Sequence, residues 1–397
     1  MIRHARTRRR HPLLRSTALV ALAVVSFGGV GAATAYVRLE NNIETFDVTR
    51  LTGPAPTPEV EEPVDPTDPH AGEALNYLIM GSDVRDGENA LIGGEVEGMR
   101  SDTTIIMHIS AARDRVELVS IPRDSQVQIP DCLFHDGTSS RPQFERFNAA
   151  FATGARNDDV GEAAACTIRT VQTLTGITIH GWVVVDFAGF RNMVDALGGV
   201  SMCLPEDMSS DLANLYITGS PEFQTLDGPT ALAFARARTG KGLGNGSDIM
   251  RIERQQQLIG SIAKDVLSRN ILTDSTALYR FLNATTQSLK ADPDTGNITN
   301  LMGLAFSLQN VPSGNIVFMT VPHATYPADR NRVIWTDDAS KIWAHLISDT
   351  PLIPPAVVVP EPTPGATAPA TEPAPPVVET PTYGNPFSPD DLPTVCG

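Results

Sequence analysis

Short β-rich runs alternate with longer helical patterns between residues 72 and 350. The apolar, β-branched runs are residues 76–81, 103–110, 115–121, 180–187 and 315–321. Helical spacing of apolar residues occupies 148–174, 187–197, 229–236, 248–268, 275–290, 297–309 and 336–347. This alternation predicts an α/β fold, a three-layer αβα sandwich with a central mixed sheet and helices on both faces. Functional residues in such folds gather at strand ends.

The N-terminal segment predicts a membrane anchor. Residues 1–15 contain six Arg and no acid, and residues 16–37 are 22 uncharged residues. A helix of that length spans about 33 Å, enough for a bilayer. The basic run before it and the acid-rich sequence after it place residues 1–15 in the cytoplasm and the remainder outside the cell membrane. A cleaved signal peptide is the alternative, because residues 33–35 (ATA) resemble a cleavage site.

Two Pro-rich segments flank the region of alternating patterns. Residues 38–71 form a Pro- and acid-rich spacer, and residues 351–397 form a C-terminal tail with 14 Pro between 351 and 395. Such segments are too polar and too stiff to build a packed core. The sequence therefore assigns the folded catalytic domain to residues 72–350.

The charge of the chain excludes one class of partner. The net charge is −16, and the 24 basic and 46 acidic residues after Arg15 give −22. A domain this acidic repels nucleic-acid phosphates, so we expect no nucleic-acid partner.

Four widely spaced cysteines fit a protein outside the cytoplasm. None forms a C-x-x-C motif, which disfavours a metal cluster, and an even number in an exported chain predicts two disulfides. Three connectivities are open. We favour Cys132–Cys166 together with Cys203–Cys396, a pattern that ties the C-terminus back to the fold.

Two aspartates stand at the facing ends of two predicted strands. Asp83 ends the run 76–81, and Asp102 precedes the run 103–110. If these strands form a hairpin, the two carboxylates come together, and a hard cation such as Mg²⁺, or Mn²⁺, would relieve their repulsion. The alternative is that each aspartate only caps a turn.

Arginines, and no lysine, accompany these aspartates at the ends of other predicted elements. Guanidinium groups bind phosphate oxygens bidentately, so the set predicts a diphosphate ligand with Mg²⁺. Arg236 and Arg238 stand two residues apart, so one of them must lie beyond the helix that ends there. The side chains of Asp248, Arg251 and Gln255 share one helix face. The arginines of the set are Arg100, Arg123, Arg236, Arg238 and Arg251.

Seven ordered motifs resemble the LytR–CpsA–Psr family. They are GSDVR, GMRSDTTIIMHI, RVELVSIPRDS, RFNAAFATG, VDFAGFRNMVDALGGV, LDGPTALAFARAR and DIMRIERQQQ. Members of this family are membrane-anchored phosphotransferases on the outer surface. They move a glycopolymer with one phosphate from a polyprenyl-diphosphate carrier to a muramic-acid hydroxyl of peptidoglycan. The Arg-rich, disulfide-using sequence favours an actinobacterial cell-wall polymer.

The resemblance implies a role for each matching residue. Asp83 and Asp102 correspond to the Mg²⁺ ligands, and Asp248 would orient the arginines. Arg146 stands where the family usually has Lys in its K-x-N-A-A motif, which leaves its phosphate contact open. The residues implied to bind the diphosphate are Arg100, Arg123, Arg236 and Arg238. Arg251 and Gln255 match a pair that either contacts the phosphate or supports the residues that do, and Arg85 is a further candidate for substrate binding. No general base can be assigned, although Asp124 and Asp248 are candidates.

The carrier lipid requires an apolar slot. Phe187, Phe190 and Val194 lie on one stripe of the predicted helix 187–197. Most stripes of this kind belong to the core, and the resemblance makes a contact with the polyprenyl chain an equal alternative.

Three further functions are compatible with the sequence or with the history of the family. A polyprenyl-diphosphate pyrophosphatase would use the same residues with water as the acceptor. A non-catalytic binding module would hold the lipid-linked intermediate without needing Mg²⁺. Transcriptional control is disfavoured, because 15 cytoplasmic residues are too few for a DNA-binding domain.

Overall fold

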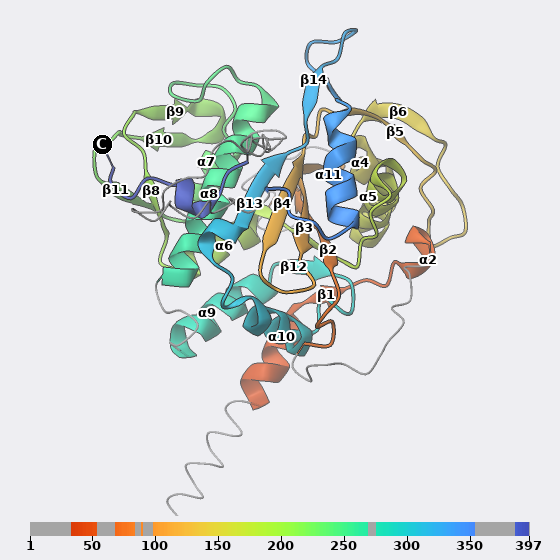
Figure 1. Ribbon diagram of the computed structural model, residues 1–397, viewed down its shortest axis with the longest axis horizontal. Helices are drawn as coiled ribbons and strands as arrows, with labels where there is room; N and C mark the ends of the chain where they lie inside the picture. Colours follow the sequence, from red (N-terminus) through yellow and green to blue (C-terminus); the bar gives the residue numbers. More distant parts are fainter. Residues whose placement is uncertain are drawn as a thin grey trace, which may run out of the picture.

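A seven-stranded mixed sheet forms the centre of the fold (Figure 1). The computed structural model describes residues 33–53, 68–83, 89, 98–268, 275–353 and 386–396. The strand order is β1-β12-β7-β2-β3-β4-β13, with β2–β3, β3–β4 and β12–β7 antiparallel and the other pairs parallel. The strands are β1 (Glu44–Thr45), β2 (Leu75–Ser82), β3 (Ser101–Ile109), β4 (Val116–Ile121), β7 (Gly181–Val185), β12 (Leu289–Ala291) and β13 (Ile316–Thr320).

Alternation along β2 explains the layers on the two faces of the sheet. Leu78 and Met80 are buried in the largest core cluster, with side chains of α5 and α11. Tyr77 and Ile79 point to the opposite face and pack with side chains of α8 and α10. A period of two therefore places apolar side chains on both faces. The predicted three-layer arrangement of a mixed sheet between helices is confirmed.

The helices agree with the predicted segments except at two places. The predicted helix 148–174 is divided at Asp159, whose carboxylate accepts a hydrogen bond from the Glu162 N–H and caps α5. The predicted helix 275–290 ends at Thr286, and the following residues form β12. The helices are α2 (Thr49–Thr52), α4 (Ala149–Gly154), η1 (Arg156–Asp158), α5 (Val160–Thr175), α6 (Phe187–Ala196), α7 (Gly228–Arg236), α8 (Asp248–Ser268), α9 (Ser275–Thr286), α10 (Ile298–Leu308), η3 (Ser313–Asn315), α11 (Asp338–Ile347) and η4 (Pro389–Asp391).

A small lobe lies between α6 and α7 in the sequence. Two antiparallel pairs of short strands build it, and they pack on α6, α7 and α8 around a separate apolar cluster that includes Val200, Leu215 and Phe234. The lobe and its strands were not predicted, because the strands are only three or four residues long. The strands are β8 (Val200–Cys203), β9 (Met208–Ser210), β10 (Leu215–Ile217) and β11 (Phe223–Leu226), and the short 3-10 helix η2 (Asp211–Ala213) lies between β9 and β10.

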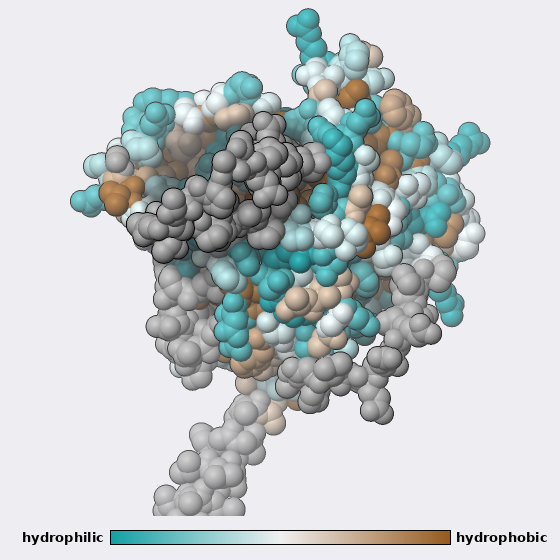
Figure 2. All heavy atoms as spheres, in the orientation of Figure 1, coloured by the Kyte–Doolittle hydropathy of each residue, from teal (hydrophilic) through white to brown (hydrophobic). Residues whose placement is uncertain are grey.

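Two hairpins complete the described secondary structure. β5 (Gln126–Ile129) pairs with β6 (Gln143–Arg146), and β14 (His323–Thr325) pairs with β15 (Val333–Trp335). Polar side chains cover much of the face seen in Figure 2, with apolar ones scattered among them.

Both disulfides of the favoured pattern are present. Cys132 is bonded to Cys166 on α5, and Cys203 of the small lobe is bonded to Cys396. The prediction of two disulfides with this connectivity is therefore confirmed, and among the four cysteines none is free.

The described residues extend the folded domain beyond 72–350 at both ends. Within the predicted spacer 38–71, Leu39 and Ile43 are buried, β1 joins the sheet, and Asp68 forms an ion pair with Arg113. Within the predicted tail 351–397, residues 386–396 pack on the domain and end in the disulfide of Cys396. The Pro-rich composition of the flanking segments therefore predicted a folded domain that is too short at both ends.

Residues 16–32 of the predicted membrane segment, and residues 1–15, which were predicted to be cytoplasmic, lie outside the described residues. Residues 33–42 are helical. No helix within the described ranges has the length and apolar character that a membrane span requires.

Candidate active site

One pocket joins a charged end to an apolar slot, between the sheet and helices α6, α7 and α8. Its volume is about 390 Å³. The charged side chains belong to the ends of β2, β3, β4 and β7, the end of α7 and the first turns of α8. Most of the lining residues further along these elements and along α6 are apolar. The charged residues are Asp83, Asp102, Arg123, Asp186, Arg236, Arg238 and Arg251, and the apolar ones include Ile79, Ile105, Leu118, Phe187, Phe190, Met193, Leu232, Leu258, Ile259 and Ile262.

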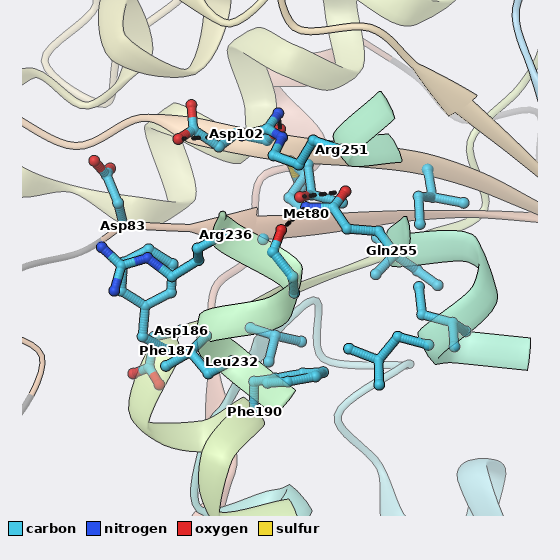
Figure 3. Close-up of a pocket in the computed structure, with 18 of the residues that line it drawn as sticks. Met80, Asp83, Asp102, Asp186, Phe187, Phe190, Leu232, Arg236, Arg251 and Gln255 are labelled. Atoms are coloured by element: carbon cyan, nitrogen blue, oxygen red, sulfur yellow. Dashed lines mark hydrogen bonds and ion pairs between the residues drawn. The ribbon is translucent and has the colours of Figure 1, made fainter. Parts of the chain in front are cut away.

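The predicted pair of carboxylates lies at the charged end. β2 and β3 form an antiparallel hairpin, as expected, and both Asp83 and Asp102 line the pocket (Figure 3). The Arg100 backbone N–H donates to Asp83 Oδ1 at 2.6 Å, which fixes the loop end of the hairpin. Two carboxylates on one pocket wall are the oxygen ligands that a hard divalent cation prefers, so these residues fit Mg²⁺ or Mn²⁺.

A buried ion-pair network orients two arginines toward the pocket. Asp248 Oδ1 lies 2.6 Å from an Arg251 Nη and 3.3 Å from Arg123 Nε. Arg123 also donates to Asp102 Oδ1 at 2.5 Å, and Arg251 donates to the Asp102 carbonyl oxygen at 2.7 Å. Asp248 is buried behind both arginines and does not line the pocket. The expected orienting contact of Asp248 with the arginines is thus present.

Asp124 connects this network to two further arginines. Its carboxylate oxygens lie 3.3 Å from Arg146 and 3.7 Å from both Arg238 and Arg123. Four arginines therefore share three buried or half-buried carboxylates, Asp102, Asp124 and Asp248, and the group retains a net positive charge. That charge favours an anionic ligand at the adjoining pocket wall.

Burial sets the direction of the pKa shifts in the network. Burial raises the pKa of Asp248, an effect that Arg251 and Arg123 oppose. Burial also raises the pKa of Asp124, and the nearby negative charge of Asp248 adds to it. Both carboxylates were candidates for a general base. Neither lines the pocket, so the structure supports neither as a base in direct contact with a ligand bound there.

The end of α7 separates its two arginines as predicted. Arg236 is the last residue of the helix, and its guanidinium lies over the Phe187 ring, 4.2 Å from the centroid. Arg238 lies beyond the helix and also lines the pocket. Arg254 on α8 donates to the carbonyl oxygens of Ala237 and Leu243, which holds the chain that follows α7 in place.

Gln255 bridges α7 and β3 at the boundary between the charged end and the slot. Its Nε2 donates to the Ala235 carbonyl oxygen at 3.1 Å, and its Oε1 accepts from the Thr103 hydroxyl at 3.2 Å. Arg251 and Gln255 both line the pocket, one helical turn apart, while Asp248 stays behind them.

The predicted lipid-contacting residues divide between the slot and the core. Phe187 and Phe190 line the pocket, where Figure 3 shows them on α6 near Leu232 of α7. Val194 is fully buried in the cluster of the small lobe, so its place does not support contact with a ligand in this pocket. The α6 stripe continues past the slot, and sequence periodicity alone cannot locate where the slot ends.

Two of the predicted phosphate-binding arginines, Arg100 and Arg146, are not on the pocket wall. Arg85 lies outside the described residues. The side chain of Arg100 is exposed and does not line the pocket. Arg146 contacts Asp124 instead of the pocket.

Sequence reasoning missed a third pocket carboxylate, Asp186, and the role of Arg254. Asp186 Oδ1 accepts from the Gly189 N–H at 2.7 Å and caps α6, while the side chain also lines the pocket. An Asp directly before a helical pattern is a recognisable capping signal. No sequence signal distinguishes the buried Arg254 from its neighbour Arg251.

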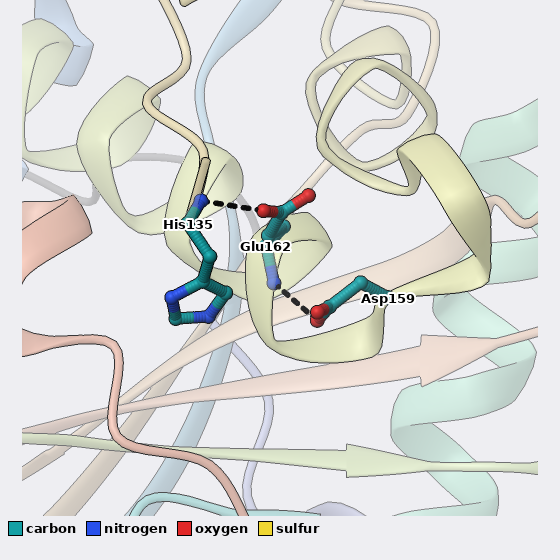
Figure 4. A group of neighbouring side chains, drawn as sticks. All are labelled: His135, Asp159 and Glu162. Carbon is teal, nitrogen blue, oxygen red and sulfur yellow. Dashed lines mark hydrogen bonds between the residues drawn. The ribbon is translucent and has the colours of Figure 1, made fainter. Parts of the chain in front are cut away.

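A second set of metal-capable side chains lies away from this pocket (Figure 4). Ligand atoms of His135, Asp159 and Glu162 lie within 4.8 Å of one another. Both carboxylates already have structural partners, because Asp159 caps α5 and Glu162 Oε1 accepts from the His135 N–H at 2.6 Å. These contacts lie next to the Cys132–Cys166 disulfide and connect the loop of His135 to helix α5. They explain the proximity of the three side chains without a metal ion.

The fold and the pocket define an α/β protein that can bind an amphipathic anion, with arginines and carboxylates at one end of a site and an apolar slot at the other. Residues 41–346 match the LytR_cpsA_psr family, and this chain therefore belongs to the LytR–CpsA–Psr family.

Similar proteins agree with this membership. The chain is 29% identical to the cell wall biosynthesis protein LcpA of Corynebacterium glutamicum, over 64% of this chain and 50% of LcpA. It is 32% identical to the probable cell wall biosynthesis protein LcpB of that organism, over 66% of this chain and 58% of LcpB. The chain thus spans little more than half the length of these two relatives. It is also 26% identical to the polyisoprenyl-teichoic acid–peptidoglycan teichoic acid transferase TagT of Bacillus subtilis, over 74% of this chain and 82% of TagT.

Solved structures share the fold. TagV of B. subtilis has a TM-score of 0.51 at 22% identity, over 70% of this chain and 99% of TagV. A structure of TagT bound to LI-WTA has a TM-score of 0.51 at 18% identity, over 77% of this chain and 98% of TagT.

Proposed function

We propose that this protein is a phosphotransferase that moves a glycopolymer from a polyprenyl-diphosphate carrier to a muramic-acid hydroxyl of peptidoglycan. The observation that carries the proposal is the continuity of the pocket. Its arginines suit a diphosphate, and its apolar slot suits a polyprenyl chain. The names of the transferase relatives support the same chemistry.

The reaction forms one bond and breaks another at the sugar-side phosphorus. The acceptor oxygen attacks that phosphorus, the bridging P–O bond breaks, and its electron pair leaves with polyprenyl phosphate. The hydroxyl proton passes to a base that remains unassigned. Arg123, Arg236, Arg238 and Arg251 would bind the phosphate oxygens and stabilise charge that develops during the transfer.

Asp83 and Asp102 would hold Mg²⁺, with Mn²⁺ as the alternative. The ion would supply charge neutralisation at the diphosphate. The remaining work belongs to the protein: Asp248 holds Arg123 and Arg251 in position, and Phe187 and Phe190 line the slot for the lipid chain.

We also propose that residues 16–37 anchor the chain in the cell membrane as a single span, with the N-terminus in the cytoplasm and the catalytic domain outside. A lipid-linked donor in the same membrane and a peptidoglycan acceptor beyond it fit this topology. The uncharged length and the basic flank of this segment support it.

Arg123→Ala tests the proposal. Loss of a guanidinium that binds the transferring phosphate should lower the rate of polymer transfer by roughly 10²–10³-fold. The exposed Arg141→Ala is the matched control and should retain the rate of the unmodified protein. Circular dichroism should show that both variants are folded. Full transfer by folded Arg123→Ala would overturn the proposed role of the arginine cluster.

Product analysis separates transfer from hydrolysis and from binding alone. A transferase releases polyprenyl phosphate in proportion to polymer joined to added peptidoglycan. A pyrophosphatase releases it equally without the acceptor, and a binding module releases none. Chelation of divalent cations should abolish transfer, and added Mg²⁺ should restore it.

A further inference from the structure

Helix α10 exposes an apolar stripe on the outside of the domain. Its 11 residues include no charged side chain. Met302 and Phe306, one turn apart, are 41% and 60% exposed, and Thr299 lies on the same stripe. Single exposed apolar residues are common on proteins. The stripe therefore indicates a binding surface only in combination with the features that lie beside it.

The chain enters the domain from its N-terminal segment beside this stripe. The Tyr36 hydroxyl forms a hydrogen bond with the Thr299 hydroxyl at 3.1 Å. Leu39 and Ile43 pack in one cluster with Ile298 of α10. Figure 1 shows the N-terminal helix running next to α10 at the lower end of the molecule. The helix 33–42 includes the last residues, 33–37, of the uncharged sequence 16–37, so α10 lies where an anchored chain would leave the bilayer.

On its other side, α10 packs against the central sheet. Leu304 and Leu308 pack against the core cluster that contains Ile105 and Leu118, and both of these residues line the pocket. Helix α10 thus contacts the N-terminal segment and packs on a core cluster that includes part of the pocket wall.

We infer that α10 is a membrane-docking helix whose Met302 and Phe306 insert into the lipid surface beside the anchor. The partner of the stripe is the bilayer. The helix face is uncharged and lies next to exposed Tyr36 and Val37, a composition typical of protein surfaces at a membrane interface. Docking in this orientation turns the slot toward the membrane that holds the carrier lipid. The inference rests on the proposed membrane anchor and lipid-linked substrate.

Spin labels on the full-length protein test the docking. The protein is reconstituted in vesicles of equal parts phosphatidylglycerol and phosphatidylethanolamine, with a nitroxide at Met302→Cys or Phe306→Cys. The four native cysteines form disulfides and leave the introduced thiol as the labelling site. Leu212→Cys, on the small lobe and 92% exposed, is the matched control.

A docked helix makes the labels at 302 and 306 accessible to oxygen and shielded from a water-soluble nickel chelate, and the label at 212 should show the reverse. Labels at 302 and 306 that the nickel chelate reaches as readily as the one at 212 would overturn the inference. Labels shielded from both reagents would overturn it too, since another part of the chain would then cover the stripe.

A transfer assay in the same vesicles distinguishes this inference from the proposed function. Phe306→Glu should lower transfer from membrane-embedded carrier by roughly tenfold or more, the scale set by losing the burial of one aromatic side chain. Transfer should recover in detergent micelles, where no bilayer orients the domain. If the unmodified protein transfers polymer but the label on Phe306→Cys lies in water, docking alone is overturned. If the labels insert into lipid but the unmodified protein transfers no polymer, the proposed function alone is overturned.

Discussion

Asp248 shows how much of the site depends on one residue that does not face the pocket. It is buried and contacts both Arg123 and Arg251, and these two arginines line the wall where a phosphate would bind. Without its carboxylate, Arg251 would keep a buried positive charge whose remaining ion pair is with Asp102, at 3.7 Å between Nη1 and Oδ2. Burying an unpaired charge costs far more than losing an exposed ion pair.

We therefore expect Asp248→Asn to lower the free energy of unfolding by about 3 kcal/mol and to lower transfer as well. Asp338→Asn is the matched control. Asp338 also begins a helix and forms an ion pair, at 2.6 Å, with Lys341 three positions later. The side chains of Asp338 and Lys341 are both half exposed. That variant should change stability by no more than about 1 kcal/mol. Urea denaturation measures the free energy of unfolding of both variants. Equal losses of stability in the two variants would contradict the assigned role of Asp248.

His108 links stability to pH at the sheet end far from the pocket. Its ring is fully buried between Asn76 Oδ1 at 2.8 Å and Asp349 Oδ1 at 3.0 Å. Burial lowers the pKa of His108, although Asp349 opposes the shift. The unfolded chain then binds a proton at about pH 6.5, before the folded protein does, so the free energy of unfolding should fall as pH drops below about 6.5.

Denaturation curves between pH 7.5 and 5.5 measure this slope. His108→Gln, which keeps a hydrogen-bonding side chain but cannot titrate, should be less stable at pH 7.5 and should lose part of the slope. An identical slope in the variant would show that other groups cause the pH dependence.

At the scale of elements, two glycines with a left-handed backbone follow the end of α6. Gly198 and Gly199 have φ of +79° and +89°, and the Gly199 N–H donates to the Val194 carbonyl oxygen at 3.0 Å. A Cβ on Gly199 would lie 2.8 Å from the Leu226 carbonyl oxygen of β11, whereas a Cβ on Gly198 would meet nothing within 4 Å. The two glycines thus share a left-handed backbone but differ in their surroundings.

This difference makes a paired prediction. Gly198→Ala should lower the free energy of unfolding by about 1 kcal/mol, the cost of a left-handed backbone for a residue with a side chain. Gly199→Ala should cost roughly 1–3 kcal/mol more, because strand β11 must also shift. Urea denaturation of the two variants compares the costs directly. Equal losses would mean that the contact with β11 relaxes freely.

The elements that carry chemistry were predictable because each combines a pattern with a boundary signal. β2 and β3 have apolar, β-branched runs that end at Asp83 and begin beside Asp102, and α8 begins with Asp248. The small lobe was not predictable, since strands such as β9 are too short to show a period. The sequence did not predict that Val194 lies in the core, because the apolar side chains of α6 form one stripe. Part of this stripe lines the slot and part of it packs in the core of the small lobe.

At the scale of the whole molecule, long-range pairing explains what local patterns could not show. The Pro-rich composition of residues 351–397 indicates a tail, yet Phe387 exchanges two backbone hydrogen bonds with Phe318 of β13, at 2.6 and 2.9 Å. The two rings also pack together, with centroids 5.8 Å apart. The cysteine count predicted that Cys396 would return to the fold, but nothing in the sequence predicted a backbone pairing with the edge strand.

The Cys203–Cys396 disulfide holds this returning segment across the domain, from β13 past α8 to the small lobe. Its closed loop spans a sequence separation of 193 residues, against 34 for Cys132–Cys166. Cys203→Ser/Cys396→Ser should lower the free energy of unfolding by about 2–4 kcal/mol. The loss should begin locally, because residues 386–396 can detach while the two main core clusters stay packed.

Hydrogen exchange checks that order of events. In the double serine variant, the Phe318 and Phe387 amides should exchange much faster, while amides of α5 keep their protection because they pack on the other face of the sheet. Cys132→Ser/Cys166→Ser is the matched control and should give the reverse pattern, since Cys166 lies on α5. Unchanged exchange at Phe318 after loss of the Cys203–Cys396 bond would show that the pairing with β13 holds the C-terminal segment without the disulfide.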